Sequence, residues 1–142
     1  MKTSSAGIAL IEKWEQFRAE PYRDTCGVFT QGFGHTRTVT ANSQAITIKK
    51  ARELLMQDID IVEHYINSNF KLRQCQFDAL VSLLFNIGTG KFSRTKLFKL
   101  LKENPDSKYI SDEWIEFRNA GEKYLRGLLR RRLDELQLYY SW

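Results

Sequence analysis

The chain has 142 residues, of which 42% are hydrophobic and 27% charged, and its formal net charge is +5. This length allows one domain with a sizeable core, and the composition is typical of a globular protein rather than a disordered one. The apolar runs are only a few residues long, so we expect no membrane span. The positive charge favours an anionic partner: nucleic acid, a membrane surface or a bacterial wall.

The first residues, "MKTSSAGIALIEKWEQF" (1–17), begin like a secretion signal. Charged residues at positions 12, 13 and 15 then interrupt the apolar stretch, and no cleavage site of small residues follows. We therefore expect the protein to be made in the cytoplasm and to reach any target outside it by a route that does not use a secretion signal.

The cysteines and histidines do not suggest a metal site. Cys26 and Cys75 are far apart, and with the two histidines they lack the spacing of metal ligands. We expect two free thiols and no metal. Nucleic acid has only the net charge in its favour, because no zinc-finger, RNA-recognition or clear helix-turn-helix pattern is present.

Hydrophobic spacing predicts a first helix from about Ser4 to Phe17, capped by a serine at its start. Residues 22–35, "YRDTCGVFTQGFGH", combine glycines with β-branched and aromatic residues, which predicts a small hairpin. "DTCG" would be its turn. A loose polar stretch follows from 36 to 44.

The rest of the chain is predicted to be helical. Thr47 caps a helix that repeats an apolar residue every three or four positions as far as Ile66. Residues 74–86, "QCQFDALVSLLFN", are apolar nearly all round, which indicates a central buried helix. Helices are predicted at about 95–103, 111–117 and 122–140. The predicted fold class is α+β, mostly helical with a small antiparallel sheet near the N-terminus.

Three polar residues near the start form a candidate catalytic set. Glu15 shares a helix face with Ile8 and Ile11, where a carboxylate is costly unless it is paired or protonated. A hairpin folded back over the end of that helix would bring Asp24 and Thr30 toward Glu15. Taken singly, each position favours a plainer role: a boundary residue for Glu15, a turn residue for Asp24 and an ordinary strand residue for Thr30. Together, a general acid facing a carboxylate and hydroxyl that activate water is an arrangement that cleaves glycosidic bonds.

The stretch "LIEKWEQFRAEPYRDTCGVFTQGFGHT" (10–36) resembles the active-site segment of phage-type lysozymes, the endolysins of glycoside hydrolase family 24. Three later stretches also resemble this family, in the same order along the chain: "ITIKKARELLMQDID" (46–60), "QCQFDALVSLLFNIGTGKF" (74–92) and "GLLRRRLDE" (127–135). The resemblance covers nearly the whole chain.

The resemblance implies a role for each matching residue. Glu15 would be the general acid, and Asp24 and Thr30 would position and activate water for an inverting reaction. Gly32, Phe85 and Asn86 fall where the family lines its sugar cleft, and His35 and Asp58 match a structural ion pair. One of Arg130, Arg131 and Arg132 is a candidate ionic partner of Glu15, with a solvated basic helix face as the alternative.

Three departures from the family pattern affect the cleft. Gln16 stands where glycine usually follows the acid, and Gln31 replaces an aliphatic residue after Thr30. "NAGEK" (119–123) lacks the usual glycine pair. These changes bear on cleft shape and substrate fit rather than on the three candidate catalytic positions.

The resemblance implies a lysozyme-like single domain over 1–142. A small sheet-containing lobe would cover about 18–46 and a linking helix about 47–67. A helical lobe would cover about 68–142, together with the N-terminal helix. The implied activity is that of a muramidase on peptidoglycan glycan strands, acting as a monomer without cofactor. Its implied context is a phage endolysin that waits in the host cytoplasm until a holin releases it to the cell wall. The alternatives are an antibacterial effector of the same fold and an inactive peptidoglycan-binding module.

Overall fold

The structure is a computed structural model that describes residues 1–120 and 123–141. The strands form two antiparallel pairs, one near the start of the chain and a short one before the last helix, and most of the remainder is helical. In chain order the elements are α1 (Ser5–Glu15), β1 (Arg18–Arg23), β2 (Phe29–Gly32), α2 (Ile48–Asn69), α3 (Gln74–Ile87), the 3-10 helix Phe92–Arg94, α4 (Lys96–Glu103), α5 (Ile110–Trp114), β3 (Asn119–Ala120), β4 (Lys123–Tyr124) and α6 (Arg126–Tyr139).

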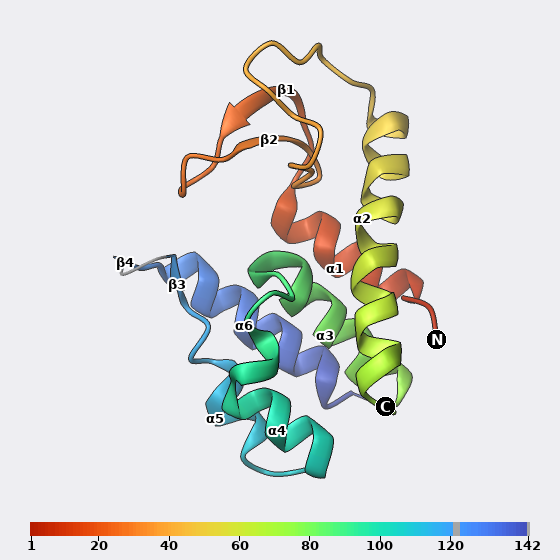
Figure 1. Cartoon of the computed structure of the whole chain (residues 1–142), viewed down its shortest axis with the longest axis vertical. Coiled ribbons are helices and arrows are strands. Elements are labelled where there is room, and N and C mark those ends of the chain that lie inside the picture. The colour runs from red at the N-terminus through yellow and green to blue at the C-terminus, as the bar shows by residue number, and fades with distance from the viewer. Residues whose placement is uncertain (121–122, 142) are drawn as a thin grey trace.

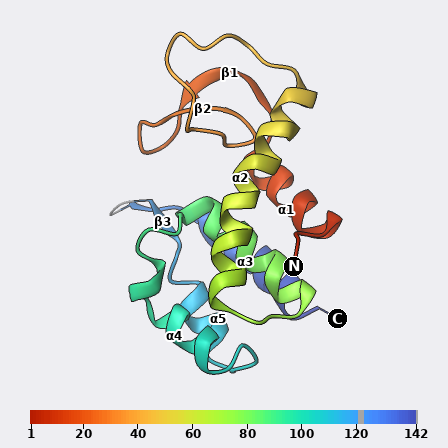
Figure 2. The ribbon, with the colours of Figure 1, turned by 45° about the vertical axis from the view of Figure 1, so that its right-hand side comes forward.

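The β1–β2 hairpin and the loop after it lie at one end of the molecule, and the helices α3 to α6 form the other end (Figure 1). The long helix α2 runs between the two ends in both views (Figures 1 and 2). α1 lies beneath the hairpin and against α3. This arrangement is the α+β fold that the sequence predicts.

The core is centred on α3. Every residue from Gln76 to Leu84 is buried, and this helix packs against α1, α2 and α6. A helix surrounded on all sides must be apolar nearly all round, as its sequence is. α2 is different, because one face packs against α3 and the other is exposed to water. The predictions for both helices are confirmed, including the Thr47 cap, whose side chain accepts a hydrogen bond from Lys50 N.

The start of α1 is fixed by a tertiary contact rather than by a local cap. Ser4 occupies the N-cap position, but its side chain makes no capping hydrogen bond. Its hydroxyl instead donates to Asp78 Oδ2, and its backbone N–H donates to Asp78 Oδ1 at 2.9 Å. Asp78 lies on the buried helix α3, so this pair of bonds ties the first helix to the core.

The first hairpin begins earlier than predicted, at Arg18 rather than near Tyr22. Its antiparallel register pairs Arg18 with Gly32 and Tyr22 with Thr30, with an irregularity between the two pairs. The early strand "RAEPYR" (18–23) is charged and contains a proline, so its composition does not identify it as a strand.

The last helix begins later than predicted. The expected start near Glu122 lies outside the described residues, and α6 begins at Arg126. A short antiparallel pair, β3 with β4, precedes it and was not predicted. Strands of two residues carry no periodic pattern, so the sequence offers no signal for them.

Candidate active site

Glu15 is the last residue of α1, where the helix ends beneath the hairpin. Its Oε2 accepts a hydrogen bond from Arg131 Nη1 at 2.5 Å, and its side chain is 17% exposed. Gly34 lies against the same carboxylate: a Cβ added there would lie 2.5 Å from Glu15 Oε1. The absence of a side chain at Gly34 therefore leaves room for the Glu15 carboxylate beside the strand end.

The chain turns sharply directly after Glu15. Gln16 has φ +56° and ψ +150°, and it is the only non-glycine residue with positive φ among those described. A side chain is strained in this region of backbone conformation, which glycine adopts freely. The substitution of Gln16 for the usual glycine therefore places strained backbone next to Glu15.

Asp24 organises the tip of the first hairpin. Its Oδ1 accepts hydrogen bonds from the backbone N–H groups of Cys26 and Val28, at 2.8 and 2.9 Å. Its own backbone N–H donates to Val28 O at 2.9 Å. Among the described residues, its second carboxylate oxygen, Oδ2, has no protein donor. That oxygen is therefore available to accept a hydrogen bond from a bound water or substrate.

Thr30 and Tyr22 face each other across the hairpin. The Thr30 hydroxyl donates its proton to Val28 O at 2.9 Å. It can therefore only accept a hydrogen bond from any further group. Tyr22 is covered by the guanidinium of Arg18, 4.1 Å from the ring centroid. Burial raises the pKa of the Tyr22 hydroxyl, and the nearby charge of Glu15 adds to the effect.

Behind Glu15 lies a cluster of buried charges centred on Glu135, which is fully buried. Glu135 pairs with Arg132, whose Nε lies 2.7 Å from Oε1, and with Arg131, whose Nε lies 3.4 Å from Oε2. The carboxylate also accepts hydrogen bonds from Ser82 Oγ at 2.6 Å and Trp114 Nε1 at 3.1 Å. We call these five residues the Glu135 network. Burial lowers the pKa of Arg132, and the charge of Glu135 opposes that shift.

A cleft of about 970 Å³ brings most of the predicted residues together. It runs between the hairpin on one side and the end of α3 with the start of α6 on the other. Its lining includes Glu15, Asp24, Thr30, Phe85 and Asn86.

Of the residues predicted to line the sugar cleft, Gly32 is not on this lining. A Cβ at Gly32 would meet Ala51 Cβ at 3.2 Å and Ile46 Cδ1 at 3.3 Å. The glycine is therefore needed for close packing of β2 on α2.

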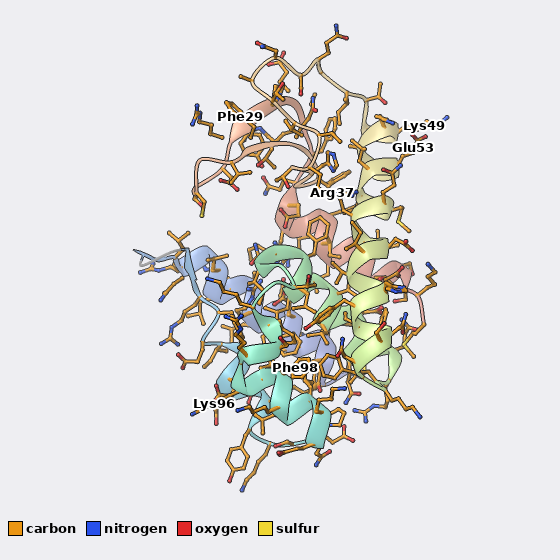
Figure 3. All side chains as sticks on the ribbon, in the orientation of Figure 1. Phe29, Arg37, Lys49, Glu53, Lys96 and Phe98 are labelled. Carbon is orange, nitrogen blue, oxygen red and sulfur yellow. The ribbon has the colours of Figure 1, made fainter. Side chains whose placement is uncertain are left out.

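His35 and Asp58 lie together at the junction of the hairpin with α2. His35 Nδ1 is 2.7 Å from Asp58 Oδ2, and its Nε2 is 2.7 Å from Thr38 Oγ1. Arg37 donates to Asp58 Oδ1 through Nε and Nη2, at 3.1 and 2.9 Å. Figure 3 shows Arg37 where the loop after β2 meets α2. These contacts join the sheet end to the long helix.

The buried amide of Gln31 has a similar joining role. Its Nε2 donates to Ala19 O at 2.9 Å and to Gln44 O at 2.5 Å. One side chain thus connects β1 to the polar loop that precedes α2. The polar group is accommodated in a packed position because both of its N–H bonds go to backbone carbonyls, so its donors are satisfied.

The structure also identifies site residues that the sequence alone does not. Of the three consecutive arginines, Arg131 reaches Glu15, Arg132 lies buried behind the cleft and Arg130 is exposed. The leucines around them predict a helix. They do not fix the rotation of the helix about its axis closely enough to decide which of three consecutive residues faces Glu15. Tyr22 and Gly34 were also missed as cleft residues, because an aromatic and a glycine fit an ordinary hairpin equally well.

In the part of the chain that the structure describes, no cluster of three or more His, Cys, Asp or Glu residues could hold a metal ion. Both cysteines are free thiols, with Cys26 exposed and Cys75 half-buried. No described helix is both long enough and apolar enough to cross a bilayer.

The α+β fold, with a cleft between a small hairpin and a helical body, is that of lysozyme-like proteins. The sequence model of the phage lysozyme family matches residues 12–135, and the chain belongs to this family. The chain is 37% identical to the endolysin of Salmonella phage P22, with 99% of each chain covered. It is 33% identical to the endolysin of Bacillus phage PZA over 99% of its own length, but spans only 56% of that longer protein. The muramidase domain of SpmX from Asticaccaulis excentricus has a similar structure, with a TM-score of 0.88, 29% identity, and 99% and 98% of the two chains covered.

Proposed function

We propose that this protein is a muramidase, which hydrolyses the β-1,4 bond between N-acetylmuramic acid and N-acetylglucosamine in bacterial peptidoglycan. The observation that supports this most directly is the single cleft lined by Glu15, Asp24 and Thr30. Family membership supports the same activity.

In the proposed reaction, Glu15 donates its proton to the oxygen of the leaving sugar as the glycosidic bond breaks. A water molecule attacks the anomeric carbon from the opposite face and gives its proton to Asp24 Oδ2, the carboxylate oxygen without a protein donor. Thr30 accepts a hydrogen bond from the same water, because its own proton is committed to Val28 O. The product has inverted configuration. Proton exchange with solvent then restores both carboxyl groups.

The remaining predicted residues have supporting parts in this proposal. Phe85 and Asn86 would contact the glycan, because both line the cleft. Gly32 would act by permitting close packing of the sheet on α2. The pair of His35 and Asp58 would hold the small lobe on the linking helix within one domain.

The proposed biological context is lysis of a host cell by a phage endolysin that acts as a monomer on the cell wall. Release from the cytoplasm through a holin-made opening is part of this proposal. The names of the P22 and PZA relatives support the phage context over a secreted antibacterial effector.

The test is digestion of purified peptidoglycan by the wild type and by Glu15→Gln, with released fragments identified by mass spectrometry. Glu15→Gln keeps the shape of the side chain and removes the transferable proton, so we expect activity to fall by about 10²–10⁴-fold. Glu20→Gln is the matched control, because Glu20 is exposed on β1 outside the cleft lining. Fragments with a reducing N-acetylmuramic acid end would identify a muramidase. If the wild type binds the wall but releases nothing, a binding module is the correct interpretation.

A further inference from the structure

We propose that Arg132 is a positioning residue that fixes Asn86 as a hydrogen-bond donor in a pocket for the acetamido group of the glycan. This inference rests on the proposed muramidase function and specifies what one part of the cleft recognises. Neither the role of Arg132 nor the polarity of the Asn86 amide follows from the sequence pattern.

The first step is the orientation of the Asn86 side chain. Asn86 Oδ1 accepts a hydrogen bond from Arg132 Nη2 at 2.9 Å. A guanidinium group has only donors, so the atom that faces it must be the carbonyl oxygen of the amide. The NH₂ group of Asn86 therefore points away from Arg132. Among the described residues it has no protein acceptor.

The second step is the rigidity of Arg132. This side chain is fully buried, and its other Nη group, Nη1, donates to Phe117 O at 3.1 Å. The guanidinium is paired with Glu135, which is itself held by Ser82 and Trp114. A planar group bound on several sides has one orientation, so the Asn86 amide is held in one orientation too.

The third step is the chemistry of the pocket that Asn86 enters. A hollow of about 420 Å³ adjoins the catalytic cleft and shares Asp24 and Asn86 with it. Five of its other lining residues are apolar, Lys91 adds a cation, and Arg132 binds two of the lining residues, Asn86 and Phe117, from behind. The apolar lining residues are Ile87, Phe92, Phe117, Leu125 and Leu128.

An acetamido group fits these walls. Its carbonyl oxygen is a strong neutral acceptor for the NH₂ group of Asn86, and its methyl group can lie against the apolar side chains. A glycan without its acetyl groups presents an ammonium instead, which cannot accept a hydrogen bond from the Asn86 NH₂ group and shares the hollow with the Lys91 cation as well as with the Asp24 carboxylate. The pocket should therefore favour N-acetylated over N-deacetylated glycan.

The direct test uses Asn86→Asp, which preserves size and keeps an oxygen facing Arg132 but replaces the donor group by a negatively charged acceptor. Binding of native and chemically N-deacetylated glycan strands is measured in the Glu15→Gln background, so that cleavage does not interfere. We expect binding of native strands to weaken roughly 3- to 10-fold and binding of deacetylated strands to strengthen, so that the preference reverses. Asn42→Asp makes the same charge change in the exposed loop before α2 and should leave the preference intact.

An unchanged preference in Asn86→Asp would overturn the proposal. Because this readout is binding, it stays informative if the wild type proves unable to cleave peptidoglycan. The two hypotheses can therefore fail separately.

The role of Arg132 is tested by Arg132→Lys, which retains a cation beside Glu135 but cannot bind Asn86 and Phe117 together. We expect KM for N-acetylated substrate to rise several-fold with kcat nearly unchanged, whereas a general structural defect would lower both activity and stability.

A second measurement needs no substitution at a buried site. The side-chain amide of Asn86 in the wild type should show restricted motion by ¹⁵N relaxation, unlike that of Asn42. Equal mobility of the two amides would contradict the positioning role, even if Arg132→Lys fails to fold.

Discussion

On the helical wall of the cleft, Glu15 is held by Arg131 and, behind it, by the buried Glu135 network. On the hairpin wall, Asp24 is held by two backbone N–H groups of its own turn and remains partly exposed. The proposed acid is thus positioned by long-range charge pairs from the last helix of the chain. The proposed base is positioned by contacts within five residues.

This difference separates stability from activity. Charges that are buried and paired are costly to disturb, because removing one partner leaves the other unpaired away from water. A turn on the surface that is closed by one side chain contributes less to the fold. Substitutions that remove a charge from the helical wall should therefore affect folding and activity together, whereas those on the hairpin wall should affect mainly activity.

The largest expected effect on stability is that of Glu135→Gln. It leaves Arg131 and Arg132 without their buried counter-charge, and we expect a loss of about 3–5 kcal/mol in the free energy of unfolding. Urea denaturation followed by circular dichroism measures this loss. Asp60→Asn removes a carboxylate from an exposed pair with Lys2 and should cause no measurable change. Equal effects of the two variants would show that the network is not a source of stability.

Asp24→Asn tests the opposite wall. The amide keeps an oxygen to accept the turn hydrogen bonds but cannot take a proton from water, so we expect a 10²- to 10⁴-fold loss of peptidoglycan hydrolysis. Its midpoint of urea unfolding should stay close to that of the wild type. A large loss of stability without a matching loss of activity would reverse the assignment of the two walls.

Gly34→Ala tests the point where the two walls meet. The added Cβ would collide with Glu15 Oε1, and the Gly34 φ of +73° disfavours any side chain. We therefore expect the free energy of unfolding to fall by about 1–3 kcal/mol and the activity to be reduced. Gly90→Ala is the control, because a Cβ there meets nothing within 4 Å. If Gly34→Ala retains full activity, the position of Glu15 tolerates more displacement than its contacts suggest.

Gln16→Gly should give the smallest effect, and in the stabilising direction. Removing the side chain relieves the strain at φ +56°, and this should outweigh the greater freedom of glycine in the unfolded chain. We expect the free energy of unfolding to rise by about 1 kcal/mol. Thermal unfolding measures the gain. Gln16→Ala keeps a Cβ and should not reproduce it, so a gain in both variants would point to a cause other than backbone strain.

The sequence predicts the long elements well and the short ones poorly. α2 and α3 carry repeated apolar spacing over many turns, and the structure confirms both. β1 has no such pattern, and β3 and β4 are too short to have one. The glycines of the hairpin are similarly ambiguous: Gly34 makes room for Glu15, whereas Gly32 permits packing on α2.

The candidate site was predictable where the relevant residues are neighbours in the chain. Glu15, Asp24 and Thr30 lie within sixteen positions of one another and do line one cleft. The sequence could not distinguish Arg131 from the two adjacent arginines as the partner of Glu15, because that pairing depends on how α6 is rotated against α3. The pairing of Arg132 with Asn86 depends on the same packing, across 46 positions of sequence.

The exposed thiol of Cys26 has a practical consequence. It stands at the rim of the hollow beside Asp24, whereas the thiol of Cys75 is half-buried and donates to Tyr139 O at 3.5 Å. A maleimide dye should therefore attach to the hairpin tip in preference to the core. The mature fold thus carries a built-in attachment point from which fluorescence can follow glycan entering and leaving the cleft in real time.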